Sequence, residues 1–212
     1  MQTYKKTMEN GGQYILRCDN DEETGRDVSF VIIDDVLYNI IGIAEYYEKI
    51  TVPKGVRIIK SDSIIDMSDD TDPQEMECNE FRIPASVELI EPNAFSPSFF
   101  EIHSITLDSK NKAYKLINGL LYTADGKKLI HFPSDAEEES GVARIPEGTA
   151  EIEKGAIQWV KKLIIPDSVT KFGDLSKSAA EWEGIFCAVV GPGSAAEKYC
   201  RKHEIPFEYS QN

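Results

Sequence analysis

The chain has 212 residues, of which 41% are hydrophobic and 28% are charged, and its formal net charge is −14. This length allows one domain, or two small ones, with a real hydrophobic core. The 37 acidic residues outnumber the 23 basic ones, and the basic residues form only short pairs such as Lys127-Lys128. Because an anionic surface repels polyanions, we expect no nucleic-acid partner and no binding to anionic membranes.

The N-terminal residues 1–48 match no repeat in the chain, and we predict that they form an N-terminal β cap. YILRC (14–18) and VSFVII (28–33) are joined by a polar segment, a pattern that predicts an antiparallel hairpin. The most apolar region, 28–43, is interrupted by Asp34 and Asp35. It is therefore too short and too charged to span a bilayer, and no membrane insertion is expected.

The segment from Met1 to Cys18 contains two lysines but no apolar stretch after them, so no secretory signal is visible. We therefore expect a cytoplasmic protein if Met1 is the natural start, and a secreted or cell-surface protein otherwise. The four cysteines are irregularly spaced in a chain that is not a small secreted scaffold; they are Cys18, Cys78, Cys187 and Cys200. This usage favours buried free thiols over disulfides.

A repeated pattern begins at Val52, in which an apolar residue precedes a proline and further apolar or β-branched residues follow at +3 and +6. The copies are Val52-Pro53 with Val56 and Ile59, Ile83-Pro84 with Val87 and Ile90, Ile145-Pro146 with Thr149 and Ile152, and Ile165-Pro166 with Val169 and Phe172. Proline lacks an N–H for a strand ladder and has a fixed φ. Each copy therefore predicts a short strand that ends at the proline and turns.

Other strand-like segments lie between and after these copies, at 104–107, 127–132 and 187–190. The predicted strand ends are at positions 52, 83, 107, 132, 145, 165 and 190, so that successive ends are separated by 31, 24, 25, 13, 20 and 25. A short strand cannot bury its apolar face alone, so we expect stacked strand-turn units. Such stacking would align Ile83, Ile145 and Ile165 in one ladder, with the side chains at +3 and +6 in rows behind it.

A longer internal similarity relates residues 34–53 to residues 118–133. Each begins with an acidic or Asn/Gly turn followed by two aliphatic residues and a tyrosine, and each ends in a strand and a proline. The similarity equates Tyr38 with Tyr122. Ala124-Asp125-Gly126 lies between apolar runs and predicts a hairpin insertion near 118–133.

The phrases IPASVELIEPNAF (83–95), INGLLYTADGKKLIHFP (117–133), IPDSVTKFG (165–173) and VVGPGSAAEKYCRKHEIPFEY (189–209) resemble the BspA-like leucine-rich repeat family, over about residues 50–209. The resemblance implies a β-rich, mixed α/β leucine-rich repeat solenoid. Its short parallel strands would stack in a right-handed curved superhelix over residues 49–190. Many members are surface or secreted proteins of host-associated bacteria with a role in adhesion, and the family has no shared catalytic residues.

This chain departs from the family in having few copies, one unusually short interval between strand ends (132 to 145) and an acidic insertion at 66–80. Residues 191–212 predict a closing helix and strand, which would cap the solenoid. Ser194 with Glu197 matches a helix capping box, and Ile205-Pro206-Phe207 would form the last edge strand.

Candidate catalytic and metal-binding residues are sparse. His103, His131 and His203 are accompanied by no serine elbow and no HExxH motif, and we interpret His131 as a surface or half-buried side chain. Cys187, Cys200 and His203 include a ligand-like spacing, but no fourth zinc ligand is apparent. On the closing helix, Cys200 occupies a small-residue position, which favours a compact apolar role.

The acidic segment 66–80 carries oxygen ligands at EF-hand-like positions 1, 3, 5 and 12, namely Asp66, Ser68, Asp70 and Glu77. Thr71 stands where the sharp turn requires glycine, and Pro73 intrudes. A solvated acidic loop is therefore favoured over a calcium site.

These observations predict a non-catalytic protein-binding module without cofactor, metal or catalytic residues, whose partner is another protein. Strand alternation suggests Arg82, Thr106, His131 and Arg144 as exposed contact positions. The alternatives are an extracellular adhesin-type surface protein with an export signal outside this sequence, a self-associating structural protein, and a hydrolase or metal-dependent enzyme built on the same fold.

Overall fold

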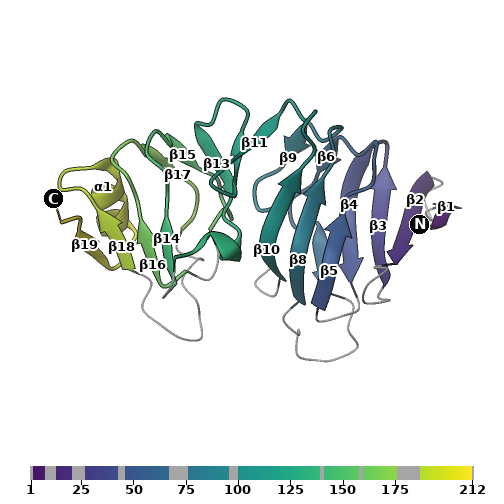
Figure 1. The fold of residues 1–212 in the computed structure, drawn as a ribbon, viewed down its shortest axis with the longest axis horizontal. Helices are drawn as coiled ribbons and strands as arrows, with labels where there is room; N and C mark the ends of the chain where they lie inside the picture. Colours follow the sequence, from purple (N-terminus) through teal and green to yellow (C-terminus); the bar gives the residue numbers. More distant parts are fainter. Residues whose placement is uncertain are drawn as a thin grey trace. The chain divides into compact units, whose positions relative to one another are not determined.

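The computed structural model describes residues 2–7, 13–20, 27–42, 46–66, 76–95, 100–138, 141–157, 160–175 and 187–211. The chain forms two compact units, Met1–Tyr114 and Lys115–Asn212, built from short strands (Figure 1). In the described ranges, no helix has the length and apolar content required to cross a membrane.

The first sheet of the first unit has the strand order β1-β2-β3-β4-β6-β9, with β7 also paired to β4. Its strands are β1 (Gln2–Thr7), β2 (Gln13–Asn20), β3 (Asp27–Ile33), β4 (Val36–Gly42), β6 (Ile58–Ile59), β7 (Ile64–Asp66) and β9 (Leu89–Ile90). Strands β1 to β4 pair antiparallel in chain order, which confirms the predicted pairing of 14–18 with 28–33. Strand β4 then pairs parallel with β6, and β6 with β9.

The second sheet of the first unit is parallel throughout, in the order β10-β8-β5. It consists of β5 (Tyr46–Thr51), β8 (Met76–Ile83) and β10 (Phe100–Leu107). Thr51 pairs with Arg82, and Arg82 pairs with Thr106. The paired residues are 31 and 24 positions apart in the sequence, which are the same separations as those of the predicted strand ends at 52, 83 and 107. The repeat spacing therefore sets the register of this sheet.

The proline of each repeat copy closes a turn of the same kind. The N–H at the +3 position donates to the proline carbonyl oxygen at 3.1–3.3 Å, from Val56 to Pro53, Val87 to Pro84, Thr149 to Pro146 and Val169 to Pro166. The side chain at +6 then lies in a two-residue strand or at its end. Ile59 pairs with Ile90, and Ile152 pairs with Phe172. The predicted +6 row is therefore present in each unit.

Neighbouring turns are joined by one recurring hydrogen bond. The N–H of Gly55 donates to Ser86 Oγ, and that of Gly148 donates to Ser168 Oγ, both at 3.1 Å. Gly55 and Gly148 have φ of 95° and 86°, in the region that favours glycine. Equivalent positions of successive copies thus stabilise each other in the same way.

Two further sheets are drawn almost entirely from the second unit, in the orders β11-β12-β13-β15-β17 and β14-β16-β18-β19. The strands are β11 (Tyr114–Ile117), β12 (Leu120–Thr123), β13 (Lys128–His131), β14 (Val142–Arg144), β15 (Glu151–Ile152), β16 (Lys162–Ile164), β17 (Lys171–Phe172), β18 (Cys187–Val190) and β19 (Phe207–Tyr209), with a short 3-10 helix at Ser134–Ala136. Strands β12 and β13 pair antiparallel around Gly126, which confirms the predicted hairpin.

The parallel sheet of the second unit again follows the repeat spacing. Val142 pairs with Lys162, and Leu163 pairs with Ala188. These pairs are 20 and 25 positions apart in the sequence, as are the predicted strand ends at 145, 165 and 190. The predicted strand at 127–132 is not part of this stack. As β13 it is one arm of a hairpin and pairs parallel with β15 instead, so the short interval from 132 to 145 is not a repeat.

The predicted ladder of Ile83, Ile145 and Ile165 is wrong. Ile83 ends β8 in the first unit, whereas Ile145 and Ile165 follow β14 and β16 in a different sheet. There the N–H of Ile145 donates to the carbonyl of Ile164 at 3.0 Å. The three residues therefore belong to two separate sheets.

The similarity of residues 34–53 to residues 118–133 does not extend to side-chain environment. Tyr38 is 40% exposed on β4, whereas Tyr122 is fully buried on β12 and shares a hydrogen bond of 2.8 Å with Thr149 Oγ1. The reason is topological. β4 leads directly into the parallel row β6-β9, but β12 is separated from β15 by β13.

The C-terminal segment folds as the capping motif predicts. Ser194 Oγ accepts the N–H of Glu197 at 3.1 Å at the start of α1 (Ala195–Lys202), and the Glu197 carboxylate accepts the N–H of Gly193 at 2.6 Å. The helix buries Ala196 and Cys200. Strand β19 then pairs parallel with β18 at the end of the sheet.

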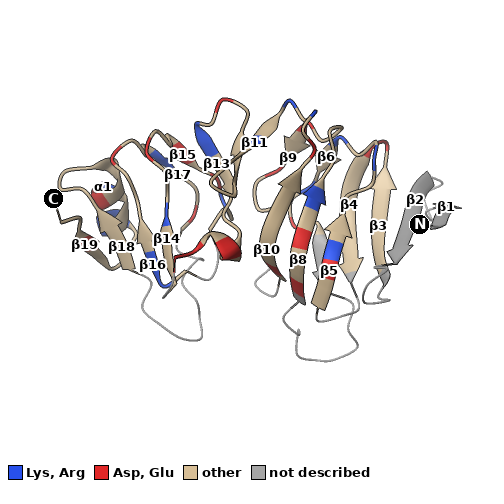
Figure 2. Ribbon diagram, viewed as in Figure 1, with Lys and Arg blue, Asp and Glu red and all other residues tan. Residues whose placement is uncertain are grey.

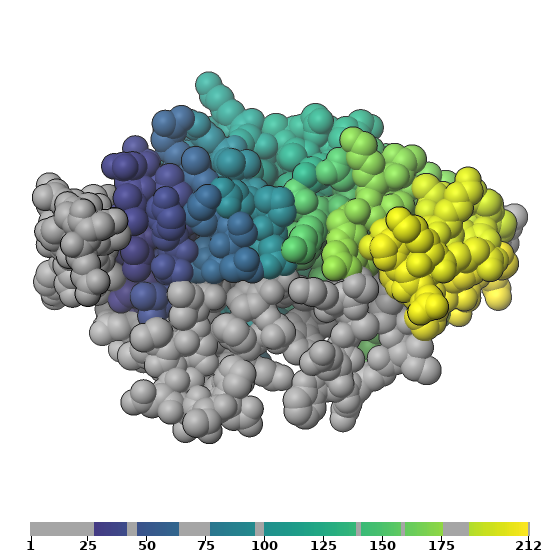
Figure 3. Space-filling view, turned by 180° about the vertical axis from the view of Figure 1, so that it is seen from behind, coloured from purple at the N-terminus to yellow at the C-terminus, as the bar shows by residue number. Residues whose placement is uncertain are grey.

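Each unit buries apolar side chains from its own strands and turns. In the first unit Phe81 packs edge-to-face on Phe95, with ring centroids 5.2 Å apart. The core of the second unit includes Leu129, Leu163 and Ala188. Seen from behind, the surface of the first unit shows its segments as neighbouring bands in chain order (Figure 3), as expected for successive stacked copies.

Candidate functional site

The outward side of the β10-β8-β5 sheet is a polar surface of the first unit. Here we call the non-buried residues of 46–51, 77–82 and 101–106 the polar face. The opposite side of the same strands is buried and apolar, as at Ile50, Phe81 and Ile105. Acidic and basic positions lie close together on β5 and β8 (Figure 2).

All three strands break the two-residue alternation of a regular strand at the same level. Two successive non-buried residues separate the buried ones, at Glu48-Lys49 on β5, Asn79-Glu80 on β8 and His103-Ser104 on β10. This break turns an additional row of polar side chains outward. Ser104 Oγ donates to the carbonyl oxygen of Asn79 at 2.7 Å and so satisfies the backbone at this level.

Hydrogen bonds hold the side chains of the polar face in place. The Glu48 carboxylate accepts from Tyr46 Oη at 2.6 Å and from Asn79 Nδ2 at 2.7 Å. Because these bonds connect β5 with β8, they orient the side chains across the sheet as well as along a strand.

A second group of hydrogen bonds surrounds Glu80. Its carboxylate accepts from Arg82 Nη2 at 2.7 Å and from Thr106 Oγ1 at 2.5 Å. The hydrogen bond from the Arg82 guanidinium is the main cause that lowers the pKa of Glu80, so this carboxylate is ionised at neutral pH. Arg82 and Thr106 are exposed, as predicted from strand alternation.

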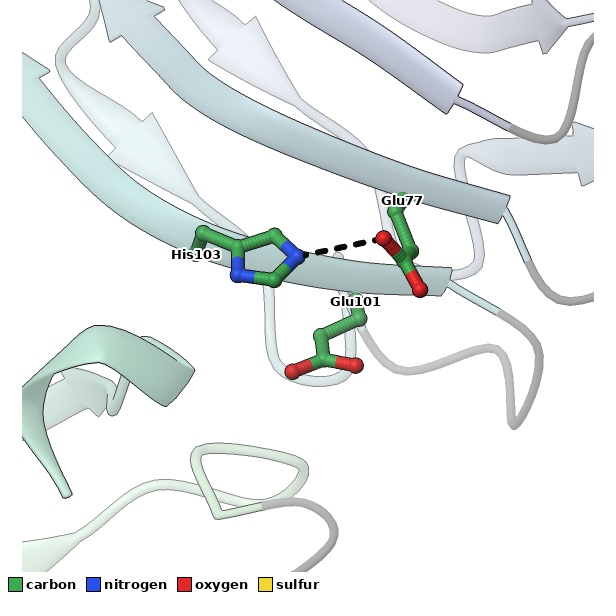
Figure 4. A group of neighbouring side chains, drawn as sticks. All are labelled: Glu77, Glu101 and His103. Carbon is green, nitrogen blue, oxygen red and sulfur yellow. Dashed lines mark ion pairs between the residues drawn. The ribbon is translucent and has the colours of Figure 1, made fainter. Parts of the chain in front are cut away.

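Two carboxylates and one imidazole converge at the other end of the polar face. Glu77 on β8 pairs in register with Glu101 on β10, and His103 lies two positions after Glu101 (Figure 4). His103 Nε2 lies 3.5 Å from Glu77 Oε2. One ligand atom from each residue lies within 4.8 Å of the others, which makes this the one group in the described ranges with three or more side chains placed to share a metal ion.

No short sequence motif groups these three residues, since Glu77 belongs to the acidic segment 66–80 and His103 is a candidate only for a catalytic role. The sequence signal that could have placed Glu77 beside Glu101 is their separation of 24 positions, which equals the separation of the predicted strand ends at 83 and 107. The Glu-x-His pattern of residues 101–103 then puts both side chains on one face of a strand.

The outward side of the β14-β16-β18 sheet in the second unit is less polar. Ile164 and Val189 are neighbours on β16 and β18 and are partly exposed, and Arg144 is exposed beside Ile164, as predicted. Lys162 forms an ion pair of 2.5 Å with Glu208 across this sheet. This side therefore combines apolar strand residues with charged neighbours.

The prediction that His131 is exposed is wrong, because its side chain is only 2% exposed on β13. Its neighbour Ile130 is buried as well, so alternation does not apply at this position. Because the successive side chains of Ile130 and His131 point to opposite faces and are both buried, both faces of β13 are covered here. Burial lowers the pKa of His131 to about 4, so the imidazole is neutral at pH 7.

Of the residues considered for zinc, Cys187 and Cys200 lie near enough to interact, whereas His203 is exposed and stacks on Tyr199 with centroids 4.3 Å apart. Cys200 lies on the buried side of α1, and its burial, with a smaller contribution from Cys187, raises the pKa of its thiol to about 11. Cys78, Cys187 and Cys200 are free thiols, and Cys187 is only partly buried. Of the calcium hypothesis, Ser68, Asp70, Thr71 and Pro73 lie outside the described residues.

Comparison with known proteins gives two weak structural likenesses. No family model and no curated protein matches the chain. The chain is similar to a leucine-rich repeat protein from Eubacterium ventriosum ATCC 27560, at 16% identity and a TM-score of 0.45 over 77% of this chain, and it spans 64% of that protein, less than two thirds.

The chain is also similar to the pneumococcal vaccine antigen PcpA. The identity is 14% and the TM-score 0.35, over 87% of this chain and 70% of that protein. Superpositions of this quality carry no argument about function. The architecture described above therefore rests on the strand pairing of the chain itself.

Proposed function

We propose that this chain is a non-catalytic protein-binding module that contacts its partner through the polar face. We further propose that its stacked strands are part of a right-handed solenoid of the BspA-like leucine-rich repeat type. Repeat architectures of this kind commonly present one extended side of their strands to a partner.

The observation that carries the proposal is the preformed hydrogen-bond network of the polar face. Glu48 and Glu80 each accept two side-chain hydrogen bonds from neighbouring positions. Side chains that are already oriented lose little conformational entropy when a partner binds. A face built in this way is suited to specific polar contacts with another protein.

The positions available for direct contact are chemically suitable. Arg82 and Thr106 are exposed and paired in register on β8 and β10. Arginine is enriched at protein interfaces and contributes strongly where it is already oriented.

The surroundings of Ser104 and His131 are unsuited to catalysis and support a binding role. Ser104 Oγ donates its hydrogen bond to the carbonyl oxygen of Asn79, so the hydroxyl proton is not directed to a base. His131 is buried and therefore closed to a substrate. These arrangements support a surface that recognises a partner without transforming it.

Site-specific photo-crosslinking tests the proposal directly. A photoreactive phenylalanine analogue is placed at Thr106 on the polar face, or at Lys110, an exposed control position in the turn after β10. Each variant is irradiated in cytoplasmic, surface and secreted fractions of the source cells. In one of the three fractions, we expect the variant at position 106 to yield a discrete crosslinked protein. The variant at position 110 should yield none in that fraction.

Equal labelling from both positions, or none from position 106 in every fraction, would contradict the use of this face. A product that contains two copies of the chain itself would favour the self-associating structural alternative. A partner found only in the surface or secreted fraction would favour the adhesin-type alternative. The fraction would also test the predicted location, which is cytoplasmic if Met1 is the natural start and secreted or cell-surface otherwise.

The proposed organisation has three parts. Residues 1–48 act as the N-terminal cap, residues 49–190 as the solenoid with its hairpin insertion, and residues 191–212 as the closing cap. In support of the two caps, the antiparallel strands β1 to β4 precede the parallel rows, and α1 and β19 follow the last repeat copy.

A further inference from the structure

We infer that Glu77, Glu101 and His103 form a binding site for a divalent first-row transition metal ion, with Zn²⁺ as the probe of choice. The site lies at one end of the polar face. It does not depend on the proposed protein partner, because its three ligands come from this chain alone.

The spacing of the ligand atoms fits a shared ion. His103 Nε2 and Glu77 Oε2 are 3.5 Å apart, longer than the 2.7–3.2 Å of a typical N–H···O hydrogen bond. Two ligands at zinc's usual bond length of about 2.0–2.1 Å are roughly 3.3 Å apart in a tetrahedral shell. The carboxylate of Glu101 lies near enough to complete a set of three after a rotamer adjustment.

The backbone at the site places two like charges side by side. Glu77 and Glu101 are paired residues of adjacent parallel strands, and each of the two strands buries apolar residues on its other side. Two carboxylates at paired positions repel each other, at a cost to the free energy of the metal-free chain. A divalent cation between them would turn this repulsion into attraction.

The composition of the ligand set decides the class of metal. One imidazole and two carboxylates suit zinc, iron or manganese, whereas calcium prefers six to eight oxygen ligands and no nitrogen. Three protein ligands leave at least one coordination position for water or for a ligand from another molecule. The site would therefore be an open one at the surface of the sheet.

Calorimetric titration of the chelator-treated full chain with Zn²⁺ tests the inference. The variants are Glu101→Gln and His103→Gln, and the matched control is Glu88→Gln, which removes the same charge at an exposed position of the first unit outside the polar face. We expect one Zn²⁺ per chain, at least about tenfold weaker binding by each site variant, and a change of no more than about twofold in the control. Circular dichroism checks that each variant is folded.

Cobalt provides a second readout, since a bound imidazole alters the visible absorption of Co²⁺. The spectrum of the wild-type chain should be lost in His103→Gln and kept in Glu88→Gln. The inference is overturned if Zn²⁺ does not bind, if all three variants bind like the wild type, or if Ca²⁺ binds this group more tightly than Zn²⁺. The metal titrations do not depend on a protein partner, and crosslinking from Thr106 does not depend on a metal ion. Failure of the metal-site inference can therefore be distinguished from failure of the proposed protein-binding function.

Discussion

The imidazole of His131 illustrates how the position of a strand overrides the pattern of its residues. Alternation along KLIHF suggested an exposed or half-buried side chain, but both faces of β13 are covered and its His131 is buried. Burial disfavours the charged imidazolium form. This is why the pKa of His131 falls from its ordinary value of 6.5 to about 4.

This pKa predicts a pH dependence of stability with a definite sign. Between pH 6.5 and pH 4 the unfolded chain binds a proton at His131 that the folded chain does not, so the free energy of unfolding falls as the pH falls. His131→Leu removes this contribution. From pH 7 to pH 5, the wild type should lose about 2 kcal/mol more than the variant.

Urea unfolding followed by circular dichroism at the two pH values measures the difference. Ile130→Val serves as the control, because it alters packing at the neighbouring buried position without changing a titratable group. It should lower stability equally at both pH values. A His131→Leu variant with the same pH dependence as the wild type would show that the imidazole is protonated in the folded chain.

Among the short strands, β17 depends on a glycine for the close approach of two turns. Gly173 follows β17 directly and donates its N–H to the carbonyl of Ile152 at 2.7 Å. A Cβ atom at this position would overlap the backbone of Glu153 and Lys154 in the preceding copy. Neither backbone segment can move aside without breaking the pairing of β15 with β17.

Gly173→Ala should therefore lower the free energy of unfolding by about 2–3 kcal/mol, as overpacking in a rigid environment does. Gly193→Ala is the matched control, since it has open space around it and suffers only from its positive φ of 77°, at a cost of about 1 kcal/mol. Chemical denaturation of both variants gives the comparison. Equal losses, or a neutral Gly173→Ala, would mean that the copies are not packed this closely.

Register is the property of these elements that the sequence predicts best. Four of the predicted separations, 31, 24, 20 and 25, recur as pairing offsets because proline or a turn ends each strand at the same point of its copy. The segment 118–133 is predicted as a hairpin, but its second strand also matches the repeat pattern. Like a true copy, KLIHF-Pro133 is an apolar run that ends in a proline. Only its pairing with β12 and β15 distinguishes the two.

For the molecule as a whole, composition limited the classes of partner but did not locate a site. From a net charge of −14 we expect no polyanionic partner unless positive charge is segregated on the surface. The polar face depends on contacts between side chains far apart in the sequence, such as Thr106 with Glu80 and Asn79 with Glu48. Motif searches over short windows cannot detect such contacts, whereas the strand offsets could have predicted them.

The account depends most on the register of β8 with β10, which sets the polar face and the Glu77–Glu101–His103 group together. The most direct measurement is a crystal structure of the zinc-soaked chain with anomalous data at the zinc edge. We predict Glu77 paired with Glu101 and an anomalous peak between Glu77, Glu101 and His103. A one-residue shift of the pairing would put Glu77 and Glu101 on opposite sides of the sheet, and that result would contradict the account.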